Sequence, residues 1–562
     1  MVSTTWAPPA PLVAHPPPSR PSGDVPSAAP PAIDVAAAQR YMEGHDHATR
    51  AAVLDVMASS PTFRLVAGES KEVERQRTAA RWSELAAAGV FVNTITSADP
   101  VAGRGKLDAV HETASLLDYS LCIGMSVHFS LFGGSIAALG TPAQAAAWLP
   151  GVEALTMRGC FALTELGHGS NARGVETEAR FDAAADAFVL HTPSDGAQKY
   201  WIGGAAFTAR WAVAFAQLYL PGEGDSRGVH AFVVRIRADD GAPVPGVLLA
   251  DCGYKVGLNG VDNGRIWFTA VPVPRAQLLA RYARVDAAGV YSCDAPSPDA
   301  LFGVTMGALS GGRIGIAASG VGQARVALAI AVRYGLRRRA FAAAPGAPET
   351  LLLDYPMHRR RLLPRLATTV VHQGCLNDLK ARWGGRLSAK DGHVASCGYK
   401  ALMTWHALDT MQVAREACGG QGYKSENRIA VSRYGRGGGE GGGGGCFGFA
   451  RAPAPGLGAF GLMGWLCLFA CLLLFLTCCC GASLTCALMS FLHLIASCMS
   501  MLVALLFALE SGFVVIHRAA LDISATFEGD NTGMLVVVRL VDAAHGHCPP
   551  GVVFVSSSRS RV

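Results

Sequence analysis

One glutamate in the sequence has neighbours that suit a general base. Glu528 lies between Phe527 and Gly529, so an apolar ring and a residue that permits close backbone approach flank its carboxylate. An apolar, desolvated pocket raises the pKa of a carboxylate towards neutrality, which is the property that proton abstraction near pH 7 requires. An isolated Phe-Glu-Gly is more often a surface acid in a turn, so the assignment depends on other parts of the chain.

Two glycine-rich blocks precede this glutamate. The first reads GCFALTELGHGSN over residues 159–171, and the second reads REACGGQGY over residues 415–423. In the first block, Gly167, Gly169 and Ser170 would let the backbone approach a phosphate or a substrate closely. The simpler alternative for such a block is a glycine-rich turn that follows a strand.

Together and in this order, the three segments resemble the acyl-CoA oxidase branch of the acyl-CoA dehydrogenase superfamily. The resemblance covers roughly residues 36–430 and 518–540. It implies an FAD enzyme that converts a fatty acyl-CoA to the trans-2-enoyl-CoA and reduces O₂ to hydrogen peroxide, the first step of peroxisomal fatty acid β-oxidation. It also implies a homodimer. The peroxisomal location rests on the family alone, because the last residues do not form a Ser-Lys-Leu-type ending.

The resemblance assigns roles around the reacting bond. Such a reaction needs a base for the α-proton, donors to the thioester oxygen and a cofactor that accepts the β-hydride. By resemblance, Glu528 is the base and Thr164 binds the polar edge of the flavin ring. Trp201 would pack on the flavin, and Gly203 would supply a backbone N–H near its reactive nitrogen. For Trp201 alone, ordinary core packing is the competing interpretation.

The resemblance also assigns residues to the rest of the cofactor. Gly169 and Ser170 would approach it through their backbone, and Arg338 would meet the FAD pyrophosphate across a dimer interface. An arginine triplet such as 337–339 is usually a solvated helix face, although bidentate pairing suits arginine to phosphate. The three glycines of the second block would admit the adenosine half of FAD: Gly419, Gly420 and Gly422.

Two positions favour an oxidase over a dehydrogenase that passes electrons to a flavoprotein. His168 stands where the dehydrogenases usually have a small residue, and Gly203 stands where they tend to have threonine. A dehydrogenase of this kind is the less favoured alternative within the superfamily. A membrane-anchored or inactive relative is the alternative from another class.

The predicted fold class is α+β and acyl-CoA dehydrogenase-like. Apolar residues recur at helical spacing in the N-terminal part, whereas short β-branched and aromatic runs between turn residues predict a middle β-barrel domain. Long amphipathic runs such as 314–339 then predict a C-terminal helical bundle that is interrupted and shortened. The predicted parts are a disordered leader (1–33), an N-terminal helical domain (34–155), the β domain (156–275), a helical domain for flavin and CoA (276–430), an insert (431–517) and the remaining helical segment with the base (518–562).

The insert does not resemble any part of such an enzyme. Residues 435–445 are nearly all glycine, and residues 452–509 are 58 residues without Asp, Glu, Lys or Arg. That length would allow two membrane spans of roughly 20 residues each, so a membrane anchor and a buried core segment are both possible interpretations. We favour a third, a segment foreign to the native protein such as a retained intron, because residues 425–429 and 518–522 would be nearly adjacent in the resembling family.

Composition excludes some other classes. Lys and Arg exceed Asp and Glu by only six, an excess too small to indicate a nucleic-acid partner. Outside the insert the cysteines are scattered singly, which is typical of a reducing compartment. No CxxC has a matching second pair, so we expect no metal site. We expect contact with a membrane only if the tract 452–509 is genuine.

Overall fold

The computed structural model describes residues 33–64, 66, 69–383, 387–427 and 429. The predicted base, Glu528, and the predicted parts at 431–517 and 518–562 therefore lie outside the described residues, as does nearly all of the predicted leader.

The N-terminal part is a layer of helices. Their bounds are α1 (Val35–Glu43), α2 (His47–Ser59), the 3₁₀ turn η1 (Pro61–Phe63), α3 (Lys71–Ala87), α4 (Pro100–Ser115), α5 (Tyr119–Met125), the π-helix η2 (Ser126–Gly133), α6 (Gly134–Leu139) and α7 (Pro142–Glu153). Helix α4 begins where the Asp99 side chain accepts the backbone N–H groups of Val101 and Ala102, which satisfies donors that a helix start leaves open. Leu85 and Phe129 are fully buried between these helices.

The middle part consists of two sheets that share one apolar core. The larger has the order β1-β5-β2-β3-β9 with β6 paired to β5, and the smaller has the order β4-β8-β7. Phe188 and Phe232 of the larger sheet pack in the same core as Ile266 of the smaller one. The strands are β1 (Gly159–Ala162), β2 (Glu178–Asp182), β3 (Ala187–His191), β4 (Lys199–Gly203), β5 (Trp211–Tyr219), β6 (Val229–Arg235), β7 (Val247–Asp251), β8 (Asn263–Phe268) and β9 (Val271–Pro274). Three 3₁₀ turns and one hairpin connect or follow them: η3 (Ala172–Gly174), η4 (Asp195–Ala197), η5 (Arg275–Gln277), and β10 (Ala283–Val285) with β11 (Tyr291–Cys293).

The C-terminal part of the described chain is again helical. Its long helices α9, α10 and α11 pack along one another, and Gly320 of α9 allows the backbone of α11 to approach, since a Cβ there would lie 3.6 Å from Thr404 Cα. The elements are α8 (Pro298–Thr305), α9 (Ala308–Gly335), β12 (Arg339–Ala342), β13 (Glu349–Leu351), η6 (Leu352–Asp354), α10 (Pro356–Arg382), α11 (Ala389–Ala417), η7 (Gly419–Tyr423) and η8 (Ser425–Asn427).

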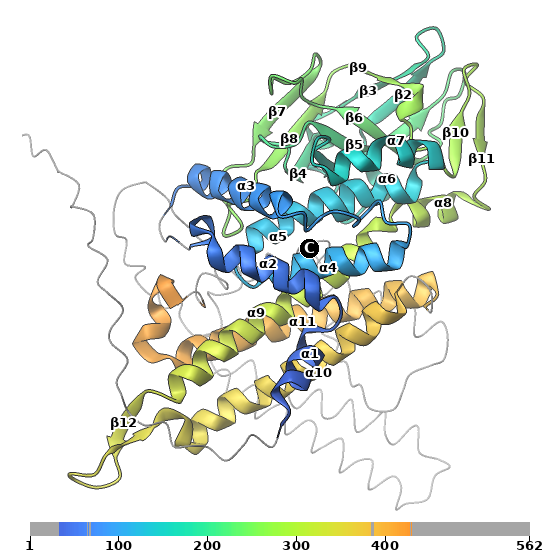
Figure 1. The fold of residues 1–562 in the computed structure, drawn as a ribbon. Coiled ribbons are helices and arrows are strands. Elements are labelled where there is room, and N and C mark those ends of the chain that lie inside the picture. The colour runs from blue at the N-terminus through green and yellow to red at the C-terminus, as the bar shows by residue number, and fades with distance from the viewer. Residues whose placement is uncertain (1–32, 65, 67–68, 384–386, 428, 430–562) are drawn as a thin grey trace, which may run out of the picture.

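The predicted order of a helical part, a β part and a second helical part is confirmed. Figure 1 shows the N-terminal helices between the two sheets and the layer of α9, α10 and α11. One detail of the prediction is wrong. The amphipathic run 314–339 was expected to stay helical, but α9 ends at Gly335 and Arg339 begins a strand that pairs with Leu351. Pairing with β13 therefore overrides the local helical pattern.

Two helical stretches of the described chain, Tyr119–Leu139 and Pro298–Gly335, are long and apolar enough to cross a membrane. Both are mostly buried inside the molecule, with 67% and 72% of their apolar windows covered. Core helices of a globular protein have the same character, so neither stretch by itself indicates a membrane protein.

Candidate active site

A buried ion pair holds the first glycine-rich block in place. The side chains of Glu165 and Lys199 have no exposed area, and Lys199 Nζ lies 2.9 Å from Glu165 Oε1. Lys199 also donates to the backbone oxygens of Leu163, at 3.2 Å, and Phe215, at 2.7 Å. The lysine, at the start of β4 in the smaller sheet, therefore connects the loop that follows β1 to β5 of the larger sheet.

The carboxylate of Glu165 accepts further hydrogen bonds from the end of the same loop. Thr177 donates its N–H at 2.9 Å and its hydroxyl at 2.6 Å, and the N–H of Glu176 donates at 2.7 Å. His168 Nδ1 lies 3.1 Å from the second carboxylate oxygen. Burial alone would raise the pKa of Glu165, but the charge of Lys199 and these donors hold that pKa below its usual value. Glu165 is thus a fixed anion around which residues 163–177 fold.

The same loop runs beside the segment that leads into β4. Tyr200 N donates to Thr164 O at 2.8 Å, and Gly167 N donates to Gly196 O at 2.8 Å. Thr164 is thereby brought next to the strand that carries Trp201 and Gly203, although more than 30 residues separate them in the chain. A Cβ built on Gly169 would meet no atom within 4 Å, so the backbone there is open to a ligand.

Trp201 occupies an unusual position in β4. Its φ is +66°, a conformation that side chains with a Cβ rarely adopt, and its side chain belongs to the exposed large apolar groups, at 55%. Asn263 Nδ2 donates to the carbonyl of Trp201 at 2.9 Å, which helps to hold this backbone. Strain of this kind is concentrated at functional sites. The core packing considered as an alternative for Trp201 is wrong, because about half of the residue faces solvent.

Gly203 lies against the helical layer. A Cβ at this position would lie 3.2 Å from Val127 Cγ2 and 3.5 Å from Val261 Cγ1. A larger residue would therefore press on Val127 of η2. The close contact gives a structural reason for glycine where the dehydrogenases tend to have threonine.

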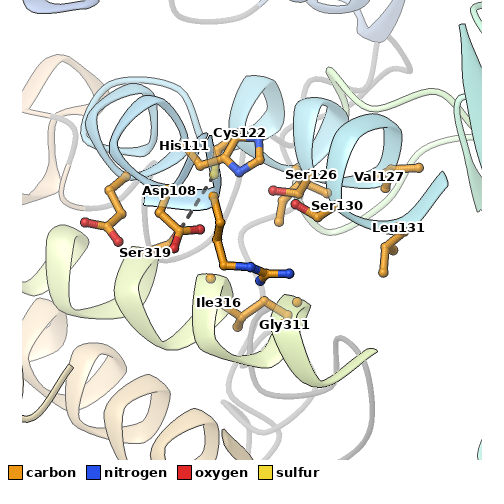
Figure 2. A pocket seen from close by; sticks show the side chains of 15 residues that line it. Asp108, His111, Cys122, Ser126, Val127, Ser130, Leu131, Gly311, Ile316 and Ser319 are labelled. Atoms are coloured by element: carbon orange, nitrogen blue, oxygen red, sulfur yellow. Dashed lines mark hydrogen bonds between the residues drawn. The ribbon is translucent and has the colours of Figure 1, made fainter. Parts of the chain in front are cut away.

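A pocket lies on the other side of Val127. It is bounded by α4, by the α5–η2 stretch and by α9, and it encloses about 610 Å³, part of which is open to solvent. Figure 2 shows Val127 and Leu131 on one wall, with Gly311 and Ile316 of α9 facing them. A Cβ on Gly315, one helical turn beyond Gly311, would meet nothing within 4 Å.

A buried histidine joins η2 to the β domain at this point. His128 Nε2 donates to Val152 O at 2.9 Å, and His128 Nδ1 accepts from Gly159 N at 3.1 Å. Burial lowers the pKa of His128 to about 4, so the imidazole is neutral at pH 7. Because Val127 directly precedes His128, these two hydrogen bonds also fix the position of Val127 relative to Gly203.

The structure does not bring the remaining predicted cofactor residues to the same place. Arg338 follows the end of α9, and Gly419 and Gly420 follow the end of α11; the region of β12 lies far from β4 in Figure 1. Gly419 has φ +55°, and no atom lies within 4 Å of a Cβ built on either glycine. Gly422 differs, because a Cβ there would lie 1.9 Å from Arg415 O. Packing against α11 explains that glycine without any ligand.

Comparison with known proteins agrees with this architecture. Three family models match in sequence: "Acyl-CoA dehydrogenase, N-terminal domain" over residues 48–154, "Acyl-CoA dehydrogenase, middle domain" over 160–271, and "Acyl-CoA oxidase, C-alpha1 domain" over 306–433. Together they cover more than half of the chain. The chain belongs to the acyl-CoA oxidase family.

Individual relatives support the same assignment. The peroxisomal acyl-coenzyme A oxidase 3 of Arabidopsis thaliana is 43% identical over 410 residues, which are 71% of this chain and 60% of that protein. The peroxisomal acyl-coenzyme A oxidase 3 of Homo sapiens is 35% identical over 344 residues, 58% of this chain and 49% of the relative. The crystal structure of acyl-CoA oxidase 1 from Yarrowia lipolytica superimposes with a TM-score of 0.61 at 32% identity, covering 71% of this chain and 61% of that one. The chain thus spans about half to three-fifths of the length of these oxidases.

Sequence reasoning missed two features of this candidate site. Glu165 and Lys199 both lie in segments that carry the resemblance, but their pairing depends on two strands that meet only in the folded sheet. The pocket beyond Val127 is formed by three separate helical segments. Its one local signal is the pair Gly311 and Gly315, spaced one turn apart on α9.

Proposed function

We propose that this chain is an FAD-dependent acyl-CoA oxidase that converts fatty acyl-CoA to trans-2-enoyl-CoA and reduces O₂ to hydrogen peroxide. The observation that carries the proposal is the junction at Val127. On one side of it lies Gly203, in the strand that runs beside the loop held by Glu165, and on the other lies the pocket between α4 and α9. A cofactor ring and an acyl chain could therefore meet at this point.

The residues present fit FAD. The open backbone at Gly169 and the half-exposed indole of Trp201 on a strained strand leave room for a phosphate and a planar ring. Thr164 would bind the polar edge of the ring, and the backbone of Gly203 would face its reactive nitrogen. Ser170 would lie beside the cofactor. When bound, FAD supplies hydride acceptance and electron transfer to O₂.

The chain's own residues bind and orient the substrate in this proposal. The pocket beyond Val127 would hold the acyl chain and keep water from the bond that reacts. Glu528 would take the α-proton, an assignment that rests on the sequence and on the family because this residue lies outside the described part of the chain. Its carboxylate would need an apolar setting that raises its pKa.

A homodimer would reconcile the two separated groups of cofactor residues. Arg338, Gly419 and Gly420 lie apart from Trp201 within one chain, so they would serve the cofactor of the partner subunit, with Arg338 at the pyrophosphate. Gly422 would support the surface formed by Gly419 and Gly420 only indirectly, by allowing this segment to pack against Arg415 of α11. Peroxisomal location follows from the relatives' names alone.

We also propose that residues 431–517 interrupt the C-terminal helical domain and are not part of the native enzyme. The other proposed domain boundaries are those predicted from the sequence. They are an N-terminal helical domain (34–155), the β domain (156–275), the helical domain for flavin and CoA (276–430) and the segment with the base (518–562). If the tract 452–509 were genuine, the protein would contact a membrane.

The test is oxygen consumption by the FAD-loaded full chain with octanoyl-CoA and no added electron acceptor. We expect one H₂O₂ and one trans-2-octenoyl-CoA for each O₂ consumed, and their loss in Glu528→Gln. Turnover that requires an added acceptor would identify a dehydrogenase instead. A protein that binds FAD but oxidises no acyl-CoA under either condition, both as the full chain and without residues 431–517, would contradict both activities.

A further inference from the structure

A second cavity lies where the N-terminal helices meet the β domain. It is bounded by α3, the α5–η2 stretch, the start of β1, the turn after β4 and the segment that leads into β8. Glycines set the distance between its walls, since a Cβ on Gly159 would lie 2.3 Å from Phe132 Cδ1 and a Cβ on Gly260 would lie 2.4 Å from Thr78 Oγ1. Walls that approach so closely suit a ligand of very few atoms.

Two buried donors of α3 line this cavity without a partner. Thr78 and Trp82 lie four residues apart, so they share one face of the helix. Thr78 is 5% exposed and Trp82 is 8% exposed, and neither the Thr78 hydroxyl nor the Trp82 Nε1 atom forms a hydrogen bond within the described part of the chain. Buried polar atoms are nearly always paired in folded proteins. These two groups therefore point to a hydrogen-bond acceptor that occupies the cavity.

A cation lies beside these two donors. The guanidinium of Arg158 lies over the ring of Trp82, with Cζ 5.3 Å from the ring centroid, and no described residue forms a hydrogen bond or an ion pair with it. Burial lowers the pKa of Arg158, because the charged form loses its hydration. An indole N–H and a guanidinium can only donate. The acceptor that would satisfy this group of donors is therefore an anion.

The carboxylate in the lining does not take this role. Asp262 accepts the backbone N–H groups of Phe207 and Thr208, both at 2.8 Å, and the Thr208 hydroxyl at 3.1 Å.

The charges around the cavity also leave one cation without a counterpart. Arg158 and Arg237 are both close enough for their charges to act on the single carboxylate of Asp262, whereas Arg75 already pairs with Asp251 at 2.9 Å. His128 in the lining adds no charge at pH 7, since burial lowers its pKa to about 4. One positive charge in excess matches an anion that carries one negative charge.

We infer that this cavity binds a small monovalent anion of the size of chloride, held by Arg158, the N–H of Trp82 and the hydroxyl of Thr78. A spherical ion accepts hydrogen bonds from any direction, which suits donors that come from two separate elements. The ion joins α3 to the residue that precedes β1, and it stabilises the junction of Val127 and Gly203, which both lie in its lining. The site is independent of the proposed oxidase function, because none of its three donors is assigned to the flavin or to the acyl chain.

The test is thermal unfolding of the full chain while sodium bromide replaces sodium gluconate at constant ionic strength. Bromide stands in for chloride, and its anomalous X-ray scattering locates it in a crystal. The variant Arg158→Gln removes the charge, and Thr78→Val removes the hydroxyl with little change of shape. Arg284→Gln is the matched control, because Arg284 lies in β10 and pairs at the surface with Asp294. General effects of the salt are common to all four proteins and cancel when their bromide dependences are compared.

We expect the unfolding temperature to rise with the logarithm of the bromide concentration above the dissociation constant, as for any ligand that binds only the folded chain. Arg158→Gln should raise that dissociation constant by about tenfold or more, and Thr78→Val by about threefold, as for the loss of a charge-assisted and of a neutral hydrogen bond. Arg284→Gln should leave it unchanged, and an anomalous peak should lie between Arg158 and Trp82.

Three results would overturn the inference. They are an unfolding temperature that does not depend on bromide, a bromide dependence that Arg158→Gln retains in full, and a bromide-soaked crystal without a peak in this cavity. Water alone would then satisfy the buried donors. None of these readouts requires turnover, so the oxidase proposal is unaffected by either outcome.

Discussion

At the scale of single residues, the Glu165–Lys199 pair determines how the loop of residues 163–177 is held. Both groups are removed from water, and the charge of each favours the charged form of the other against the effect of burial. The cost of burying two charges offsets much of their attraction. The main effect of the pair is therefore to fix the position of the loop, and its net contribution to the free energy of unfolding is small. The loop between them carries Thr164 and Gly169, so any movement of the pair would reach the proposed flavin contacts.

Replacing Lys199 with methionine should leave the buried carboxylate of Glu165 without its ion-pair partner. We expect a loss of about 3–5 kcal/mol in the free energy of unfolding, measured by urea denaturation, and weaker FAD retention in a fluorescence titration. The double variant Lys199→Met, Glu165→Gln should recover part of the stability. The matched control is Arg180→Met, which breaks an exposed pair with Glu178 and should cost less than about 1 kcal/mol. A loss in Lys199→Met no larger than in this control would contradict the account.

Gly203→Thr tests the contact between the cofactor side and the acyl pocket. The new Cβ would lie 3.2 Å from Val127 Cγ2, so we expect overpacking that costs about 1–3 kcal/mol and raises the KM for octanoyl-CoA because Val127 is pushed into the pocket. Adding Val127→Ala should restore both quantities in large part. If the second substitution gives no recovery, the effect of the threonine does not pass through Val127.

At the scale of elements, α9 combines two kinds of packing. Its first turns present Gly311 and Gly315 to the pocket, whereas small residues further along, such as Gly320 and Ala324, pack in the contact with α11. The helix is thus narrow where a substrate would lie and where a neighbouring helix approaches. Substrate space and bundle packing come from the same property, the lack of bulky side chains.

The π-helix η2 is held by His128, and this contact predicts a pH dependence of stability. The pKa of His128 is about 4 in the folded chain and near 6.5 when unfolded. Between these values the unfolded chain binds the extra proton, so stability is fully present above pH 6.5 and falls as the pH drops towards 4, by about 1.4 kcal/mol per pH unit for one proton. His128→Gln should reduce the slope of unfolding free energy against pH by about one proton. An unchanged slope would show that other groups carry the acid sensitivity.

Local patterns in the sequence were sufficient for the order of the elements, whereas the residues assigned to the flavin remain a prediction. Glycines, turn residues and the apolar runs that form β5 and β6 act over a few positions, so they can be recognised without a structure. The pairing of Glu165 with Lys199 and the pocket between α4 and α9 depend on segments that meet only after folding. The end of α9 was misjudged for the same reason, because β13 lies outside the window in which Arg339 continues a helical pattern.

At the scale of the whole molecule, the residues proposed to bind the cofactor lie in two separate regions of the described chain. Trp201 and Gly203 lie in β4, where Gly203 is close to Val127 of the pocket wall. Arg338 and Gly419 lie in the region where α9 and α11 end, near exposed side chains such as Phe341, at 81%, and Tyr423, at 84%. A second copy of the chain would cover such apolar groups and supply the missing contacts. Assembly and cofactor binding would then be coupled, because each subunit would complete the site of the other.

The same coupling predicts what removal of residues 431–517 should do. The described helical domain stops near Ile429, and the proposed base at Glu528 lies beyond the insert, so deletion would join the two parts of one domain. We expect the shortened chain to sediment as a dimer, to retain FAD with a yellow colour and to form peroxide from octanoyl-CoA, with Glu528→Gln as the inactive control. Sequencing of the mature transcript across the codons for Arg428 to Asp522 should show the tract to be absent. A transcript that contains the tract, together with a deletion variant that neither dimerises nor binds FAD, would mean that the insert belongs to the fold and that the assignment of Glu528 as the base is wrong.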